Sequence, residues 1–285
     1  MHLGKNFWVR VVSGAVYVLL ILLPFFLACE WLFGVIFAFF FLASVIELNR
    51  LTRVNRTRPL RTTLDALFAV WMLWSGMLVA KGQFIPEVAF PLLIFLMYTL
   101  LRSLFSDHQK ELLNIGNSLL TLTYIGVPAF LTALIVYCPR PSGGVLFCGD
   151  RLIALFLIVW ISDSAAYLVG SLAGKRPLWI EVSPHKTVEG LCGGLGCAAI
   201  AACFLPLLFP HTFAAYHWFT LALYGLIVAA AGVLGDLFQS MLKRRAGVKD
   251  AGNIIPGHGG ILDRLDSYLF ALPAAYALHL IATTL

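Results

Sequence analysis

The sequence predicts an all-α polytopic membrane protein with about nine transmembrane helices. Of its 285 residues, 60% are hydrophobic and only 12% are charged, and the mean hydropathy is +0.90. Such a chain has too few polar side chains to cover a soluble globule, so we expect it to bury its apolar surface in lipid. Short polar segments separate the apolar runs, which indicates a single membrane domain over residues 1–285.

The first four predicted spans cover residues 11–28, 32–48, 64–80 and 88–105, runs about as long as a membrane helix requires. The first span follows basic residues as a signal peptide would, but it is long enough to cross the membrane and a second span follows directly. We therefore interpret it as a membrane helix. The basic segment 50–61 is expected to anchor to lipid headgroups. A phenylalanine stripe in the second span is expected to face lipid: Phe33, Phe37, Phe39, Phe40 and Phe41.

Five further spans are predicted, over residues 115–137, 152–173, 191–209, 214–236 and 266–284. Cys138 and Cys148 flank a loop rich in proline and glycine before the sixth span, and a disulfide between them is left open. The six cysteines have no Cys-x-x-Cys or Cys/His spacing. Metal binding by thiolates is therefore not expected.

The distribution of basic residues predicts the orientation in the membrane. With the N-terminus in the cytoplasm, all of the 20 Lys and Arg except Lys81, Arg140 and Arg151 fall on the inner side. Cytoplasmic loops carry an excess of Lys and Arg, so we expect a cytoplasmic N-terminus and an external C-terminus. The net charge of +6 is explained by these loops, and no nucleic-acid partner is expected.

The segment 235–267 is the most charged part of the chain. Asp236 closes the eighth span, and Ser240 and Lys243 follow at i+4 and i+7 on the same helix face. A Pro-Gly-His-Gly-Gly turn follows, whose glycines let a backbone approach a ligand closely. Asp263 and Asp266 then share a face of the next helix. Carboxylates from two elements beside Lys and Arg suit a Mg²⁺–triphosphate site, because Mg²⁺ takes one or two carboxylates plus phosphate oxygens.

Each charged residue also has a structural interpretation, which the sequence leaves open. Asp236 and Asp263 could cap helices or pair with basic neighbours, and Asp266 could complement a helix dipole. Asp250 could hold a nearby lysine, and a lone Asp163 in the sixth span could join two helices by a hydrogen bond. Simpler roles also exist for the other candidates: membrane anchors for Lys243, Arg244 and Lys249, a turn residue for His258, and a helix cap for the segment 183–189.

These segments resemble the signature of the CDP-diacylglycerol synthases, or phosphatidate cytidylyltransferases. The resemblance is carried by Ser240-x-x-Lys243-Arg244, by Lys249-Asp250 and by His258-Gly259-Gly260-x-x-Asp263-Arg264-x-Asp266. Asp163-Ser164-Ala165-Ala166-Tyr167 is similar to the family's Asp-Thr-Gly-Ala-Tyr. Ser183-Pro184-His185-Lys186-Thr187-Val188-Glu189-Gly190 is similar to its Ser-Pro-Lys-Lys-Thr-x-Glu-Gly. The departures are Ser164, Ala165, His185, Gln239 and Ala251, and the resemblance covers roughly residues 155–275.

The resemblance implies a Mg²⁺-dependent nucleotidyltransferase that converts CTP and phosphatidic acid into CDP-diacylglycerol and pyrophosphate. Residues 1–150 would then supply N-terminal spans, and residues 151–285 the catalytic spans and cytoplasmic loops. The expected catalytic residues are Asp236, Asp263, Lys243 and Arg244. The expected metal ligands are Asp236, Asp263, Asp163 and Asp266. The expected substrate-binding residues are Ser183, Lys186, Thr187, Glu189, Ser240, Lys249, Asp250, His258 and Arg264.

Two other functions are compatible with the sequence. A membrane polyprenol or lipid kinase that uses CTP would share the nucleotide and cation requirements, and a transporter would also carry acids in its spans. The resemblance favours the first reading, in the inner (cytoplasmic) membrane of a bacterium with the site facing the cytoplasm. A second cation, K⁺ or Mg²⁺, and a homodimer are left open, as are the acyl-chain preference and the choice between CTP and dCTP.

Overall fold

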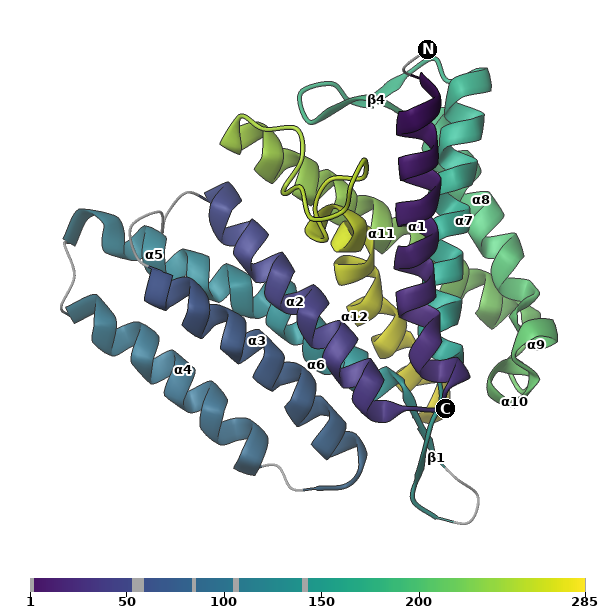
Figure 1. Ribbon diagram of the computed structural model, residues 1–285. Helices are drawn as coiled ribbons and strands as arrows, with labels where there is room; N and C mark the ends of the chain where they lie inside the picture. The colour runs from purple at the N-terminus through teal and green to yellow at the C-terminus, as the bar shows by residue number, and fades with distance from the viewer. Residues whose placement is uncertain (1–2, 53–58, 84–85, 105–107, 140–142, 285) are drawn as a thin grey trace. The chain divides into compact units, whose positions relative to one another are not determined.

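The protein is described by a computed structural model, shown in Figure 1, over residues 3–52, 59–83, 86–104, 108–139 and 143–284. These residues are helical apart from connecting turns and two short antiparallel hairpins. The chain forms two compact units. The first unit contains Met1–Gly149 and Ala246–Arg264, and the second contains Asp150–Arg245 and Leu265–Leu285.

The first unit is built from the N-terminal helices. Its elements are α1 (Leu3–Phe26), α2 (Glu30–Thr52), α3 (Pro59–Ala80), α4 (Pro86–Leu104), α5 (His108–Thr121), a π-helix η1 (Leu122–Gly126), α6 (Val127–Ile135) and the strands β1 (Tyr137–Pro139) and β2 (Val145–Phe147). Helix α3 lies between α2 and α4, as Figure 1 shows. In the β1–β2 hairpin Cys138 lies opposite Leu146, and Cys148 donates its backbone N–H to Val136.

The core of the first unit contains the phenylalanines of α2, so the expectation that this stripe faces lipid was wrong. Phe33, Phe37 and Phe41 are completely buried and Phe40 is 2% exposed, whereas Phe39 alone is half exposed. The rings of Phe33 and Phe37 lie 4.7 Å apart. These side chains pack helix against helix because α2 is covered on several sides by protein.

The second unit holds the remaining helices and the second hairpin. Its elements are α7 (Asp150–Ala173), β3 (Pro177–Trp179), β4 (Ser183–Thr187), α8 (Val188–Cys203), α9 (Leu205–Leu208), α10 (Pro210–Phe213), most of α11 (Trp218–Ala246) and all but the first three residues of α12 (Leu262–Thr284).

Glycines bring α7 and α8 into close contact. A Cβ at Gly190 would lie 2.7 Å from the carbonyl oxygen of Ala166, and one at Gly194 would lie 2.8 Å from that of Ser162. Only residues without a side chain allow two helix backbones to approach this closely. Figure 1 shows the resulting α7–α8 pair side by side.

Aromatic contacts attach α12 to α7 and to α11 in the second unit. The rings of Phe156 on α7 and Tyr268 on α12 stack with centroids 4.6 Å apart. Phe238 on α11 lies 5.5 Å from Phe270 on α12. These contacts hold α12 between the helices that carry Asp163 and Asp236.

Six helices in the described part of the chain are long and apolar enough to cross a membrane, which confirms an all-α polytopic membrane protein. They correspond to the predicted spans one, two, three, five, six and eight. The seventh predicted span is not continuous: α8 ends at Cys203 after 16 residues, and α9 begins at Leu205. Pro206 provides the reason, since it has no N–H for an uninterrupted helix. The count of nine spans stays a prediction.

Candidate functional site

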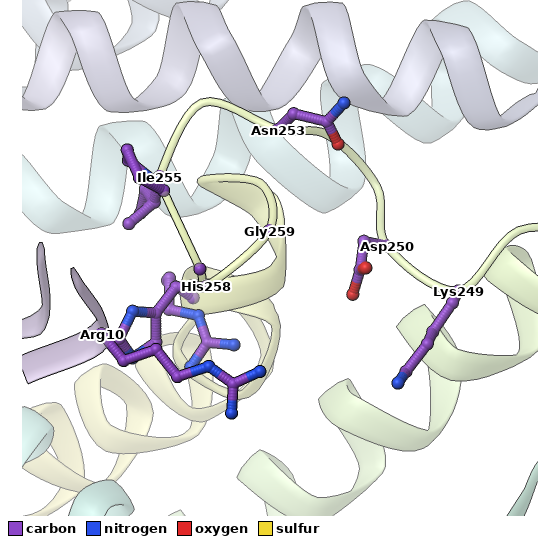
Figure 2. A pocket seen from close by; sticks show the side chains of 10 residues that line it. Arg10, Lys249, Asp250, Asn253, Ile255, His258 and Gly259 are labelled. Carbon is purple, nitrogen blue, oxygen red and sulfur yellow. The ribbon is translucent and has the colours of Figure 1, made fainter. Parts of the chain in front are cut away.

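A basic pocket of about 660 Å³ lies in the first unit (Figure 2). Ten residues line it, mostly from the glycine-rich loop after α11: Arg10, Lys249, Asp250, Asn253, Ile255, Pro256, Gly257, His258, Gly259 and Arg264. Three are permanent cations and one is a carboxylate. The charge of the lining therefore favours an anionic ligand.

The loop forms this wall because its sequence folds back on itself. The N–H of Ile255 donates to the carbonyl of Gly259 at 2.9 Å, and the N–H of His258 donates to that of Ile255 at 3.0 Å. Gly257 and Gly259 have φ angles of 75° and 86°. A residue with a Cβ is strained at such angles, so the turn itself requires glycine at these two positions.

Asp263 organises the same loop from the first turn of α12. Its side chain is 8% exposed, and Oδ2 accepts hydrogen bonds from the N–H groups of Ala251 (2.8 Å) and Gly260 (3.0 Å). These bonds fasten both ends of the loop to one carboxylate. Asp263 therefore has a structural role as the anchor of the loop, and its role as a metal ligand stays a prediction.

Glu47 on α2 is a second buried carboxylate of this loop, and it was missed by the sequence analysis. It is completely buried and accepts the N–H of Ile261 (3.3 Å) on Oε1 and that of Leu262 (2.8 Å) on Oε2. A Cβ at Gly260 would lie 2.4 Å from Oε2, and one at Gly252 would lie 2.1 Å from Oε1. The available signal in the sequence was an acid inside an apolar run, because a buried carboxylate is costly unless it is hydrogen-bonded or paired.

His258 is oriented by α1. Its Nδ1 lies 2.8 Å from the hydroxyl of Ser13, which is also 2.9 Å from the carbonyl of Pro256. Partial burial and the positive charges of Arg264 and Arg10 lower the pKa of His258 below its usual value, so the imidazole is neutral near pH 7. The next residue along this face of α1, Tyr17, donates to the carbonyl of Arg264 at 3.2 Å.

A cluster of charges lies in the second unit around Asp236. The ammonium group of Lys186 on β4 forms an ion pair with Asp236, and Ser240 donates to the same carboxylate at 3.4 Å. The Asp266 carboxylate interacts electrostatically with Asp236, Lys243 and Asp163. The structure thus brings together three predicted metal ligands with Lys186, Ser240 and Lys243.

The β3–β4 hairpin presents Lys186 to this cluster. Thr187 caps α8 by accepting the N–H of Gly190 at 3.1 Å, and Glu189 accepts the N–H groups of Lys175 and Arg176 at 3.0 and 3.1 Å. These bonds fix the ends of the hairpin, so the capping role that the sequence left open is present. Ser183 starts β4 and is half-buried.

Arg244 is tied to the same hairpin, because its Nε donates to the carbonyl of Val182 at 3.4 Å. Lys249, Asp250, His258 and Arg264 line the pocket of the first unit instead. Asp236 and Asp263, the predicted metal pair, belong to different units. Their joint action on one cation stays a prediction.

The carboxylates of the second unit suit a hard cation. Among the described residues no three His, Cys, Asp or Glu side chains are close enough to hold a metal ion by themselves. Mg²⁺ does not need such a cage, since one or two carboxylates suffice when substrate phosphates and water complete the shell. Asp236 already binds a cation, the ammonium of Lys186, beside two further carboxylates. The donor set therefore fits Mg²⁺.

The apolar helices define an integral membrane protein, and the basic lining of its pocket suits phosphorylated ligands. Residues 8–282 match the model of the cytidylyltransferase family. The chain belongs to this family and is a nucleotidyltransferase.

The chain is also similar to bacterial proteins named phosphatidate cytidylyltransferase. The protein of Staphylococcus haemolyticus is 34% identical over 237 residues, which are 82% of this chain and 86% of the relative. That of Staphylococcus epidermidis is 33% identical over 263 residues, or 91% and 94% of the two chains. That of Staphylococcus aureus strain COL is 39% identical over 180 residues, or 63% of each chain.

Proposed function

We propose that the protein transfers the cytidylyl group of CTP to phosphatidic acid, producing CDP-diacylglycerol and pyrophosphate. The observation that carries the proposal is the family match over residues 8–282, within which the signature residues line a basic pocket and a carboxylate cluster. Phosphatidate cytidylyltransferase is also the name of the relatives that match most of this chain. The product would enter phospholipid biosynthesis.

The reaction needs little acid–base chemistry from the protein. A phosphate oxygen of the lipid, already an anion, attacks the α-phosphorus of CTP, and the bond from that phosphorus to the bridging oxygen of pyrophosphate breaks. The protein must bring two mutually repelling anions into line and stabilise the leaving pyrophosphate. Lys243, Arg244 and Lys249 supply positive charge for the phosphates.

Mg²⁺ would be held by Asp236 and Asp263, with Asp163 and Asp266 in support, and a second cation, K⁺ or Mg²⁺, is compatible with four carboxylates. When bound, the metal supplies Lewis-acid neutralisation of the phosphate oxygens. Lys186 and Ser240 orient Asp236, because both contact its carboxylate. Thr187 and Glu189 hold the hairpin from which Lys186 extends.

We assign the protein to the cytoplasmic membrane of a bacterium, with the site facing the cytoplasm. The excess of basic residues in the predicted inner segments supports this orientation. CTP, a soluble nucleotide, would then reach the site from water and phosphatidic acid from the leaflet.

The test is incubation of the purified protein with labelled CTP, Mg²⁺ and phosphatidic acid. We expect a labelled CDP-lipid and pyrophosphate in equal amounts, and loss of both in Asp236→Asn and Asp263→Asn variants that still insert in the membrane. CDP and a newly phosphorylated lipid would establish a kinase instead. Ion flux through reconstituted vesicles without nucleotide would establish a transporter. Near-normal turnover in either variant would overturn the metal assignment.

A further inference from the structure

The wall of the basic pocket includes a residue that the signature does not contain. Arg10 belongs to α1, more than 200 positions before the loop that forms the rest of the lining. Figure 2 shows its guanidinium beside His258, with Lys249 and Asp250 across the pocket. Its aliphatic stem lies against the loop, since a Cβ at Gly257 would lie 2.9 Å from Cγ of Arg10.

Contacts from one turn of α1 hold Arg10 in this position. The Ser13 hydroxyl has a single proton, and the carbonyls of Arg10 (3.1 Å) and Pro256 (2.9 Å) can only accept it. When either carbonyl takes that proton, the Nδ1 of His258, 2.8 Å away, donates to the Ser13 oxygen. A Cβ at Gly14 would lie 3.5 Å from Cε1 of His258. The segment 10–14 of α1 is therefore packed against the loop that lines the pocket, and Arg10 itself lines it.

The rest of this end of α1 is suited to contact lipid. Phe7, Trp8, Val9, Val11 and Val12 are exposed, with Trp8 at 65%. The helix carries one of the six described apolar segments, Phe7–Phe26, and Arg10 stands near its beginning. Trp and Arg are residues of the membrane–water interface, the depth at which phospholipid phosphates lie. Because Arg10 lies on a lipid-facing helix, its position suits the phosphate of a lipid better than that of a nucleotide that arrives from water.

We propose that this pocket binds the phosphate monoester headgroup of the lipid substrate, and that Arg10 contacts that phosphate while Ser13 positions His258. The identity of the lipid as phosphatidic acid rests on the proposed function. Arg10, Lys249 and Arg264 together offset the two negative charges of a phosphate monoester, with Asp250 as the one acid in the lining.

The first experiment measures steady-state kinetics for Arg10→Gln and Arg10→Lys in detergent–lipid mixed micelles. Loss of one charge-assisted contact predicts a KM for phosphatidic acid raised about tenfold or more in Arg10→Gln, with the KM for CTP within about twofold of normal. Arg10→Lys is expected to recover part of the loss, and Ser13→Ala to lower kcat more than it raises either KM. Arg245→Gln, an exposed arginine outside the pocket, is the matched control.

The second experiment measures binding without turnover. Dioctanoyl phosphatidic acid, dioctanoyl phosphatidylglycerol, inorganic phosphate and CTP are each titrated into the wild type and Arg10→Gln, with thermal stability as the readout. We expect Arg10→Gln to weaken only the binding of phosphatidic acid, and inorganic phosphate to compete poorly. If the variant weakens CTP and spares phosphatidic acid, the pocket takes the nucleotide and the proposal fails. Equal competition by inorganic phosphate would show an anion site without lipid selectivity.

The two experiments also separate this inference from the proposed function. Formation of CDP-lipid with an unchanged KM for phosphatidic acid in Arg10→Gln refutes the pocket assignment alone. Binding of phosphatidic acid that depends on Arg10, in a protein that forms no CDP-lipid, refutes the proposed reaction and leaves the pocket assignment standing.

Discussion

Replacing Glu47 with Gln tests how the glycine-rich loop is held. The carboxylate receives one backbone N–H on each oxygen, from Ile261 and Leu262, and is completely buried. An amide keeps one oxygen and places an NH₂ group against the other N–H, so one hydrogen bond is replaced by two opposed donors. A hydrogen bond to a charged group contributes about 1.5–3 kcal/mol, so we expect Glu47→Gln to destabilise the protein by about 3 kcal/mol.

This loss should also appear in catalysis, because the same loop forms the pocket and places Asp263. If the variant must restore the loop geometry before each turnover, the cost of about 3 kcal/mol adds to the activation free energy. This cost corresponds to a decrease in kcat/KM of roughly 100-fold. The assays are CDP-lipid formation and thermal unfolding of the purified full chain in detergent. Glu47→Asp keeps the charge on a shorter stem and is expected to retain part of the activity.

Glu30, at the other end of α2, provides the matched control. Its carboxylate accepts hydrogen bonds from Lys81 and Tyr137, but the side chains of Glu30 and Lys81 are 34% and 38% exposed. A solvent-exposed ion pair contributes about 0–1 kcal/mol, so Glu30→Gln should leave turnover unchanged. Normal activity and normal thermal stability in Glu47→Gln would refute the loop-holding role of Glu47.

Three further predictions follow from contacts outside that loop or from the charge of His258. Gly235→Ala should abolish turnover, since its Cβ would lie 2.4 Å from the carbonyl oxygen of Asp266. Gly196→Ala is the control, because a Cβ there would have no heavy atom within 4 Å, and it should stay active when equal amounts of folded protein are compared. Lys186→Gln should lower kcat about tenfold or more by removing the partner of Asp236, and Lys186→Arg should restore part of it; equal rates in both variants would contradict this. The pKa of His258 is lower in the folded protein than in the unfolded chain, so the unfolded chain binds a proton first as the pH falls. The folded protein therefore loses stability below the unfolded pKa near 6.5. In thermal unfolding, His258→Gln should show a smaller loss of stability between about pH 7.5 and 5.5 than the wild type.

The charged segment could be predicted from the sequence because acids next to apolar runs are costly and therefore stand out. This reasoning identified Asp236, the family resemblance implied Lys186, and the structure places the two side chains in contact. Their ion pair, however, joins residues from a hairpin and a helix 50 positions apart. Nothing in the spacing of a sequence specifies such a tertiary contact.

The α2 helix explains why other features could not be predicted. Between Trp31 and Ala43 its residues are apolar on all faces, so the pattern does not distinguish the side facing protein from the side facing lipid. In water the polar face of a helix makes this distinction, but lipid and a protein core are equally apolar. The buried phenylalanines were misassigned for this reason. Arg10 was interpreted only as a positive charge near the membrane, because its partners lie at the other end of the chain.

The ion pair between Lys186 and Asp236 has a consequence for the order in which ligands enter. A metal ion that coordinates Asp236 must compete with a tethered ammonium, which never dissociates into solution. Divalent ions alone should therefore bind weakly. A divalent ion that enters together with a nucleotide should bind more readily, because the displaced Lys186 can then pair with a phosphate oxygen. With the proposed metal at Asp236, such an exchange would keep the resting protein from accumulating metal in the absence of its nucleotide, and metal loading would depend on nucleotide supply.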